Sequence, residues 1–79
     1  MGEEEVRTKG EVYAGIRAGL SESTEITQIR GVVSVLVDNL EKIQTDNPYV
    51  RRAIAMAQTK FEDACMMAVK AHYLLKENP

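Results

Sequence analysis

The feature that most constrains the fold is a heptad rhythm in the C-terminal part of the chain, between Asn47 and Lys76. Apolar residues recur there at alternating intervals of four and three positions, a spacing that only an α-helix turns into one continuous stripe. Asn47 is a favourable N-cap, and Pro48 suits the first helical position because an N–H there has no helical partner. We therefore predict a helix that begins at Pro48, ends within 76–79 and packs on other helices. Its stripe comprises Val50, Ile54, Ala57, Phe61, Ala64, Ala68, Ala71 and Leu75.

A second apolar stripe of the same period lies upstream and predicts another long helix. Cap-type residues cluster at 21–24, so we expect this helix to begin there. Additional valines widen its apolar surface beyond what one partner helix can cover. Residues 44–47 form a short polar connection of the length found between antiparallel helices. The stripe comprises Ile26, Ile29, Val33, Leu36, Leu40 and Ile43, and the flanking valines are Val32, Val35 and Val37.

The N-terminal part of the chain differs from these two segments. Residues 1–10 are polar and charge-rich without periodicity, and we expect them to be flexible. Residues 11–20 carry apolar side chains at helical spacing, which predicts a short helix. Gly15 and Gly19 each weaken that helix by roughly 1 kcal/mol relative to alanine, so docking must hold it in place. Tyr13 and Arg17 are four residues apart and would project from the same side of it.

Size and composition then limit the class of protein. A chain of 79 residues forms one domain with a small core, and such domains usually need a disulfide, a metal or oligomerisation. The single cysteine, Cys65, allows no internal disulfide and no zinc framework, which leaves oligomerisation. We therefore predict an all-α fold spanning residues 1–79: a short N-terminal helix followed by a long antiparallel helical hairpin, assembled into a homo-oligomeric bundle.

Charge and hydropathy also bear on location and partners. The chain has no 18-residue apolar run and no signal-peptide pattern, so we expect a soluble, cytoplasmic protein without a membrane partner. Twelve acidic side chains against ten basic ones argue against a general DNA-binding protein.

Residues that could carry catalysis are sparse. His72 is the only histidine, so one chain cannot assemble a histidine metal cluster or a Ser/His/Asp set. Cys65 has no base nearby in sequence and is more typical of a small buried apolar residue. Glu62 and Asp63 are adjacent and lie about 100° apart on a helix, which is unsuitable for a catalytic carboxylate pair. We expect no enzyme activity, no metal and no cofactor.

The uneven distribution of charge allows two interpretations. The helix from Pro48 is rich in basic residues and the helix before it in acidic ones, which is typical of complementary helix faces. Alternatively, Tyr13, Arg17 and Arg30 form a pocket for a small phosphorylated ligand. Aromatic rings stack on bases, and guanidinium groups bind phosphates through paired hydrogen bonds.

The segment AIAMAQTKFEDACMMAVKA, residues 53–71, resembles the C-terminal helix of a family of small phage anti-defence proteins, the anti-CBASS cyclic-nucleotide sponges. Members of that family show a pattern close to A-I-A-R-T-x-F-E-x-x-x-M-A-x-x-R-A. Residues 58–62, Gln-Thr-Lys-Phe-Glu, correspond to the central R-T-x-F-E of this pattern, and Met66, Lys70 and Ala71 follow in register. Upstream, residues 13–30 resemble the family's short N-terminal element leading into its first long helix.

This resemblance implies a helical hexamer that sequesters cyclic oligonucleotide signals in the host cytoplasm without cleaving them. It implies that Tyr13 stacks on a base and that Arg30 meets the phosphates. A second kind of pocket in the family uses the arginine–threonine pair, which implies a role for Gln58, Thr59 and Lys60. Because Gln58 replaces the arginine, Lys60 or Arg52 would have to supply the cation there. A related phage sponge family captures cyclic ADP-ribose isomers made by Thoeris defence, and the choice between these ligands stays open.

The second function hypothesis is a protein-binding helical module, such as a regulator or an assembly factor, without a nucleotide ligand. Its two apolar stripes would pack on a partner protein. Tyr13 and Arg30 would then have no part in function.

Overall fold

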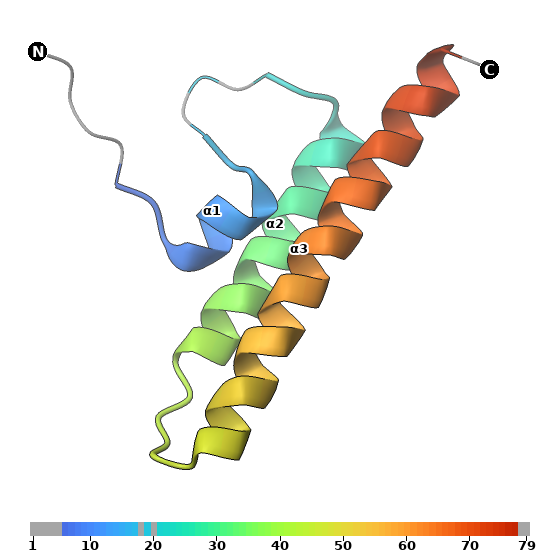
Figure 1. Ribbon diagram of the computed structural model, residues 1–79. Coiled ribbons are helices and arrows are strands. Elements are labelled where there is room, and N and C mark those ends of the chain that lie inside the picture. Colours follow the sequence, from blue (N-terminus) through green and yellow to red (C-terminus); the bar gives the residue numbers. More distant parts are fainter. Residues whose placement is uncertain (1–5, 18, 20, 78–79) are drawn as a thin grey trace, which may run out of the picture.

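The computed structural model describes residues 6–17, 19 and 21–77, and its regular structure is helical (Figure 1). Helix α1 spans Lys9–Ala14, α2 spans Thr24–Glu41 and α3 spans Pro48–Glu77. The described residues contain no strand, so the predicted all-helical class is confirmed. None of these helices is long and apolar enough to cross a membrane.

The two long helices form one layer. The chain reverses direction after α2, and α3 returns alongside it, while the short α1 lies against this layer near the middle of α2 (Figure 1). Buried apolar residues from all three elements meet between α1, α2 and α3. This core consists of Ala14, Ile26, Val33, Val37, Cys65 and Val69.

Local sequence explains where the long helices begin. The Asn47 side-chain oxygen accepts hydrogen bonds from the backbone N–H groups of Tyr49, at 2.9 Å, and Val50, at 3.4 Å. This satisfies donors that the first turn of α3 leaves unpaired, so the start predicted at Pro48 is confirmed. Ser23 caps α2 by accepting from the backbone N–H of Ile26 at 3.3 Å, and α2 begins within the predicted range.

The predicted bounds of the short helix are wrong at both ends. Thr8 and Glu11 form a reciprocal capping box, which starts α1 at Lys9 and draws residues 8–10 into ordered structure. Gly15 then adopts a left-handed conformation, φ +74°, and caps the helix directly after Ala14. The glycine therefore ends the helix where we had expected it only to weaken one. Residues 1–5, which we expected to be flexible, and Leu20, the predicted last helical residue, lie outside the described part of the chain.

Asp38 of α2 holds the start of α1. Its carboxylate accepts a hydrogen bond from the Gly10 backbone N–H at 2.7 Å and another from the Thr8 hydroxyl at 2.7 Å. A side chain at Gly10 would collide with the backbone oxygen of Ser34, because α1 and α2 lie close together there. Only glycine fits this crossing without displacement.

The face of α3 that the protomer buries differs in phase from the predicted stripe. Gln58, Cys65 and Val69 are its buried positions, while Ala64 and Leu75 of the predicted stripe are exposed. Helix α1 packs against both α2 and α3, and its contacts help to determine which side of α3 is buried. Heptad spacing alone could not show this, because it does not distinguish contacts within a chain from contacts between chains.

Candidate functional site

Arg30 occupies the centre of a polar cluster that joins the three helices. Its Nε and Nη2 donate to the Glu22 carboxylate oxygens at 2.6 and 2.9 Å, and its Nη1 donates to the Ala14 carbonyl at 2.7 Å. The Arg30 and Glu22 side chains are only 18% and 7% exposed. Hydrogen bonding from Arg30 lowers the pKa of Glu22 below its ordinary value. Each of the three guanidinium nitrogens therefore already has a protein partner.

The last turns of α3 complete this cluster. The Tyr73 hydroxyl donates to Glu22 Oε2 at 2.9 Å, and this bond raises the pKa of Tyr73. His72 Nε2 lies 3.2 Å from the Ser23 hydroxyl at the start of α2. Cys65 is buried beside Ala14, and burial raises the pKa of its thiol. The cluster therefore fixes the C-terminal half of α3 to the start of α2.

Tyr13 and Arg17 do not share a helix face, so that expectation is wrong. Tyr13 is the penultimate residue of α1, whereas Arg17 follows the helix and is exposed. The Tyr13 ring is half-buried against the core, and Lys9 Nζ lies 5.5 Å from its centroid, within the range of a cation–π contact. A base could therefore stack on Tyr13 only beside, or in place of, Lys9.

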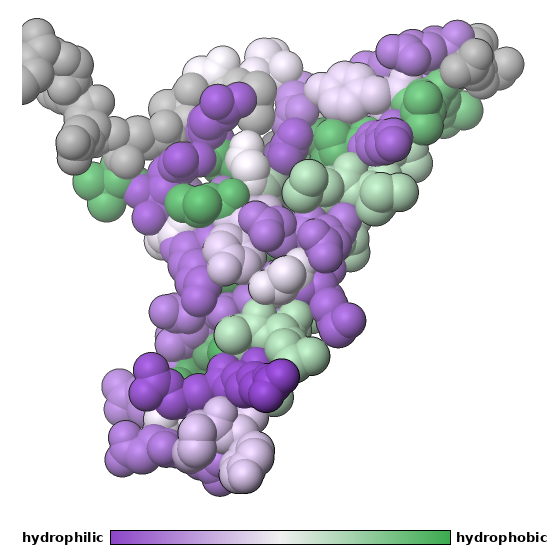
Figure 2. Space-filling view, in the orientation of Figure 1, coloured by the Kyte–Doolittle hydropathy of each residue, from purple (hydrophilic) through white to green (hydrophobic). Residues whose placement is uncertain are grey.

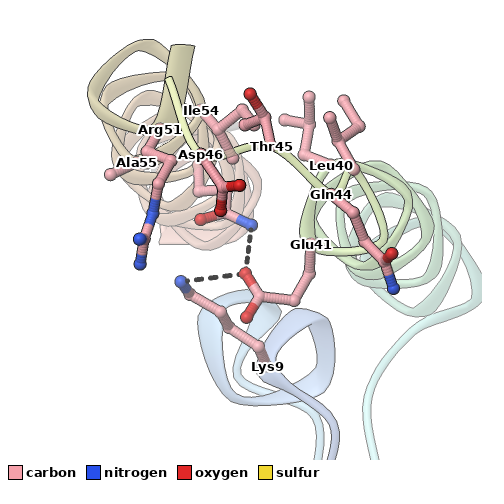
Figure 3. A pocket seen from close by; sticks show the side chains of 11 residues that line it. Lys9, Leu40, Glu41, Gln44, Thr45, Asp46, Arg51, Ile54 and Ala55 are labelled. Atoms are coloured by element: carbon pink, nitrogen blue, oxygen red, sulfur yellow. Dashed lines mark hydrogen bonds and ion pairs between the residues drawn. The ribbon is translucent and has the colours of Figure 1, made fainter. Parts of the chain in front are cut away.

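A polar cavity of about 470 Å³ lies where α2 ends and α3 begins, with Lys9 of α1 at its edge (Figure 3). Glu41 Oε1 is its central acceptor, and it receives Lys9 Nζ at 3.2 Å and Gln58 Nε2 at 3.1 Å. These hydrogen bonds, that of Gln58 first, lower the pKa of Glu41. The cavity is also lined by Leu40, Ile43, Gln44, Thr45, Asp46, Arg51, Ile54 and Ala55.

Arg51 is the cation of this cavity that remains available. Among the described residues its guanidinium has no hydrogen-bond or ion-pair partner, whereas Lys9 is paired with Glu41. The Arg51 and Lys9 side chains end at the same side of the cavity in Figure 3. Two cations there can bind an anion, and the neighbouring carboxylate of Asp46 and hydroxyl of Thr45 can bind hydroxyl groups.

Gln58 contributes to the cavity wall as a fixed group. It is 1% exposed, and its amide nitrogen also donates to the Val37 carbonyl at 3.1 Å. An amide in this position satisfies two acceptors on α2 without placing a charge in the core. The structure therefore explains why a neutral residue is accommodated here, and it assigns Gln58 a positioning role toward Glu41.

Thr59 and Lys60 lie on the outer side of α3, away from the cavity. They share a shallow groove of about 320 Å³ with Arg52, Ala55, Met56 and Asp63. The Thr59 hydroxyl donates to the Ala55 carbonyl of its own helix at 3.1 Å, so its oxygen can still accept. With two cations and one carboxylate, the groove has a net positive charge. Arg52 and Lys60, the two cations expected to replace the arginine, do lie together here.

Lys9, Glu41 and Arg51 are site candidates that we did not predict from the sequence. No local pattern marks them, because the cavity combines residues from three helices that are distant in sequence.

Among the described residues, no three His, Cys, Asp or Glu side chains form a candidate metal site. Comparison with protein-family models, with curated proteins and with solved structures finds no match for this chain.

Proposed function

We propose that this chain is a phage anti-defence protein that binds a cyclic nucleotide immune signal in the host cytoplasm and holds it uncleaved. The ligand is a cyclic di- or trinucleotide or a cyclic ADP-ribose isomer. In this proposal the long α2 and α3 form an antiparallel hairpin, and several copies, six by the sequence resemblance, assemble into one particle. Sequestration requires a shaped, charged pocket repeated on each subunit and no nucleophile.

The cavity between α1, α2 and α3 is the observation that carries this proposal. It combines a polar lining, a volume of about 470 Å³ and two cations, of which Arg51 has no partner among the described residues. Guanidinium groups bind phosphates in paired geometry, so Arg51 would contact one phosphate and Lys9 would assist. In the bound state Lys9 would exchange part of its contact with Glu41 for the ligand.

The groove on the outer side of α3 is a second candidate for phosphate binding. It brings Thr59 and Lys60, which the resemblance implicates, together with Arg52. It is shallower than the cavity, and neither of the two has an aromatic side chain among its lining residues. A wall supplied by another copy of the chain would make it deeper.

Arg51 and Arg52 provide a matched pair of variants for the test. They are consecutive on α3 and both exposed, yet Arg51 lines the cavity and Arg52 the groove. We would titrate wild type, Arg51→Ala and Arg52→Ala with cyclic di-AMP, cyclic tri-AMP and cyclic ADP-ribose by calorimetry. Lys70→Ala removes an exposed cation of α3 that lines neither hollow and serves as the control.

Loss of one phosphate contact of about 1.5 to 3 kcal/mol corresponds to a 10- to 150-fold weaker affinity. We expect this loss for Arg51→Ala and an unchanged affinity for Lys70→Ala. The opposite pattern, with Arg52→Ala alone impaired, would move the site to the groove. No heat change with any of the ligands at micromolar wild-type protein would reject the proposal.

A protein-binding module without a nucleotide ligand is the alternative function. The observation that favours it is the number of large apolar side chains that the protomer leaves exposed, among them Val32, Val35 and Leu36 of α2. It predicts that Arg51→Ala leaves function intact and that charged substitutions on this surface abolish it.

A further inference from the structure

Two groups of the polar cavity have no protein partner, and they define what a ligand must supply. Arg51 is the available cation, and Asp46 is an available anion, because its carboxylate makes no hydrogen bond or ion pair with another described residue. Lys9 and Glu41 already form an ion pair, with Nζ and Oε1 3.2 Å apart. A ligand that fills the cavity must therefore offer an acceptor to Arg51 and hydrogen-bond donors to Asp46.

The net charge of the lining argues against a ligand that is only an anion. Lys9 and Arg51 are balanced by Glu41 and Asp46, so the cavity is formally neutral. An isolated phosphate would be attracted by Arg51 and repelled by Asp46. Hydroxyl groups on the same molecule remove this conflict, because a carboxylate accepts hydrogen bonds from them. The cavity therefore suits a phosphate that is joined to hydroxyl groups.

The other lining residues suit a sugar better than a base. Leu40, Ile43 and Ile54 provide apolar side chains for the C–H groups of a ribose ring, whereas none of the described residues that line the cavity is aromatic. A base would thus find no ring on which to stack. The end of the molecule at which α2 passes into α3, at the bottom of Figure 2, is mainly hydrophilic. The ribose phosphate of a nucleotide can enter here while its base stays outside.

We propose that this cavity selects a ribose phosphate with a free vicinal diol, held by Arg51 on the phosphate and by Asp46 on the two hydroxyl groups. This rests on the proposed function and names the part of the nucleotide that is recognised. Acidic side chains bind ribose hydroxyls in the same way in dinucleotide-binding folds. Each ribose of a 3′–5′-linked cyclic dinucleotide has one free hydroxyl, whereas cyclic ADP-ribose keeps free diols. Cyclic ADP-ribose is therefore the favoured class.

Hydrogen bonds of the loop hold Asp46 close to the start of α3. The Asn47 backbone N–H donates to Thr45 Oγ1 at 3.1 Å, and the Asn47 side chain caps the first turn of α3. The Arg51 backbone N–H donates to the Asn47 carbonyl at 3.0 Å. In Figure 3 Asp46 and Arg51 come from the upper part of the view, and Lys9 reaches the cavity from below. The two recognition groups therefore start from one hydrogen-bonded piece of backbone.

The test compares adenosine 5′-monophosphate with 2′-deoxyadenosine 5′-monophosphate, which differ by one hydroxyl of the diol. Each would be titrated by NMR into the full chain as wild type, Asp46→Ala, Arg51→Ala and Asp63→Ala. Asp63 is the matched control, because it is an exposed carboxylate of α3 that lines the outer groove and not the cavity.

We expect wild type to bind the ribonucleotide about 10-fold more tightly than the deoxynucleotide, the factor for one hydrogen bond to a charged group. Asp46→Ala should remove this preference, and Asp63→Ala should keep it. Arg51→Ala should weaken both ligands by a similar factor. Equal binding of the two nucleotides by wild type, no binding of either at millimolar concentration, or a preference that survives in Asp46→Ala overturns the proposal.

Cyclic ADP-ribose and cyclic di-AMP separate this inference from sequestration itself. The diol predicts that wild type binds cyclic ADP-ribose more tightly than cyclic di-AMP and that Asp46→Ala reduces the difference. A cyclic nucleotide that binds wild type and Asp46→Ala equally well would count against the diol site only. A preference for the ribonucleotide that depends on Asp46, without binding of any cyclic nucleotide, would support the diol site and count against sequestration only.

Discussion

Arg30 and Glu22 form a two-pronged ion pair, with Nε–Oε1 2.6 Å and Nη2–Oε2 2.9 Å, across the start of α2. The third arm of the guanidinium donates to the Ala14 carbonyl and so caps the end of α1. One side chain therefore connects α2 to the segment before it and to the short helix. The resemblance implied a phosphate-binding Arg30. In the structure this residue holds the fold, and three of its five N–H donors are bonded within the protein.

Replacing Arg30 tests this structural role. Arg30→Ala leaves the Glu22 carboxylate, which is 7% exposed, without its cation, and removes the donor to Ala14. We expect a loss of about 1.5 to 3 kcal/mol in the free energy of unfolding, the range for hydrogen bonds to charged groups. Urea denaturation followed by circular dichroism measures it. Arg17→Ala is the control, because an exposed arginine should cost less than about 0.5 kcal/mol. Equal stability of the two variants would contradict the role.

The same ion pair makes the free energy of unfolding depend on pH. Hydrogen bonding from Arg30 depresses the pKa of Glu22 in the folded state below its ordinary value of 4.5. The folded state then prefers the ionised carboxylate, so the stabilisation is present above about pH 4.5 and is lost as the pH falls through the depressed pKa. We expect the free energy of unfolding to fall on acidification below this pH, with a shallower slope for Glu22→Gln. Parallel slopes for the two proteins would contradict the account.

Two glycines should respond in opposite directions to the same substitution. At Gly10 a methyl group would overlap the Ser34 backbone oxygen, and we expect Gly10→Ala to destabilise by about 1 to 3 kcal/mol. At Gly31, inside α2, a methyl group meets nothing within 4 Å, so Gly31→Ala should stabilise by up to about 1 kcal/mol through helix propensity. Thermal unfolding of the two variants beside wild type measures both effects. A stabilising Gly10→Ala would show that α1 does not dock as described.

Gln58 and Thr59 are neighbours with different roles in the protomer. Gln58→Ala removes the donor to Val37 and Glu41 from a buried position, and we expect it to cost about 1 to 3 kcal/mol. Thr59→Ala removes an exposed hydroxyl bonded to its own helix, and we expect a change within about 0.5 kcal/mol. Urea denaturation of both variants gives the comparison. A larger loss for Thr59→Ala would reverse the assignment of the buried face.

The helix boundaries show which parts of the fold can be predicted from neighbouring residues in the sequence. The starts of α2 and α3 were predictable because Ser23 and Asn47 act on backbone groups within three residues of themselves. The capping box of α1 is also local, and the spacing of Thr8 and Glu11 could have revealed it. We did not predict it, because the high charge of the N-terminal stretch led us to expect a flexible segment there. Gly15 was identified as a helix-weakening residue, but its cap role depends on its positive φ, which composition does not show.

The candidate site was less predictable, because its contacts join residues distant in sequence. Lys9 meets Glu41 across 32 positions, and no pattern in either segment indicates the pair. The burial of Gln58 depends on where α1 docks, which the heptad spacing of α3 does not contain. The apolar stripes themselves were visible in the sequence. Their assignment to contacts within or between copies required the position of α1.

The most direct test of the central claim is titration of the wild-type chain with cyclic di- and trinucleotides and cyclic ADP-ribose, followed by mass spectrometry of the recovered ligand. We predict that at least one of these ligands binds with a Kd of micromolar or tighter, that an excess of unlabelled ligand displaces it, and that it is recovered unchanged. Absence of binding by all of them, or recovery of a linearised product, would contradict sequestration by this protein.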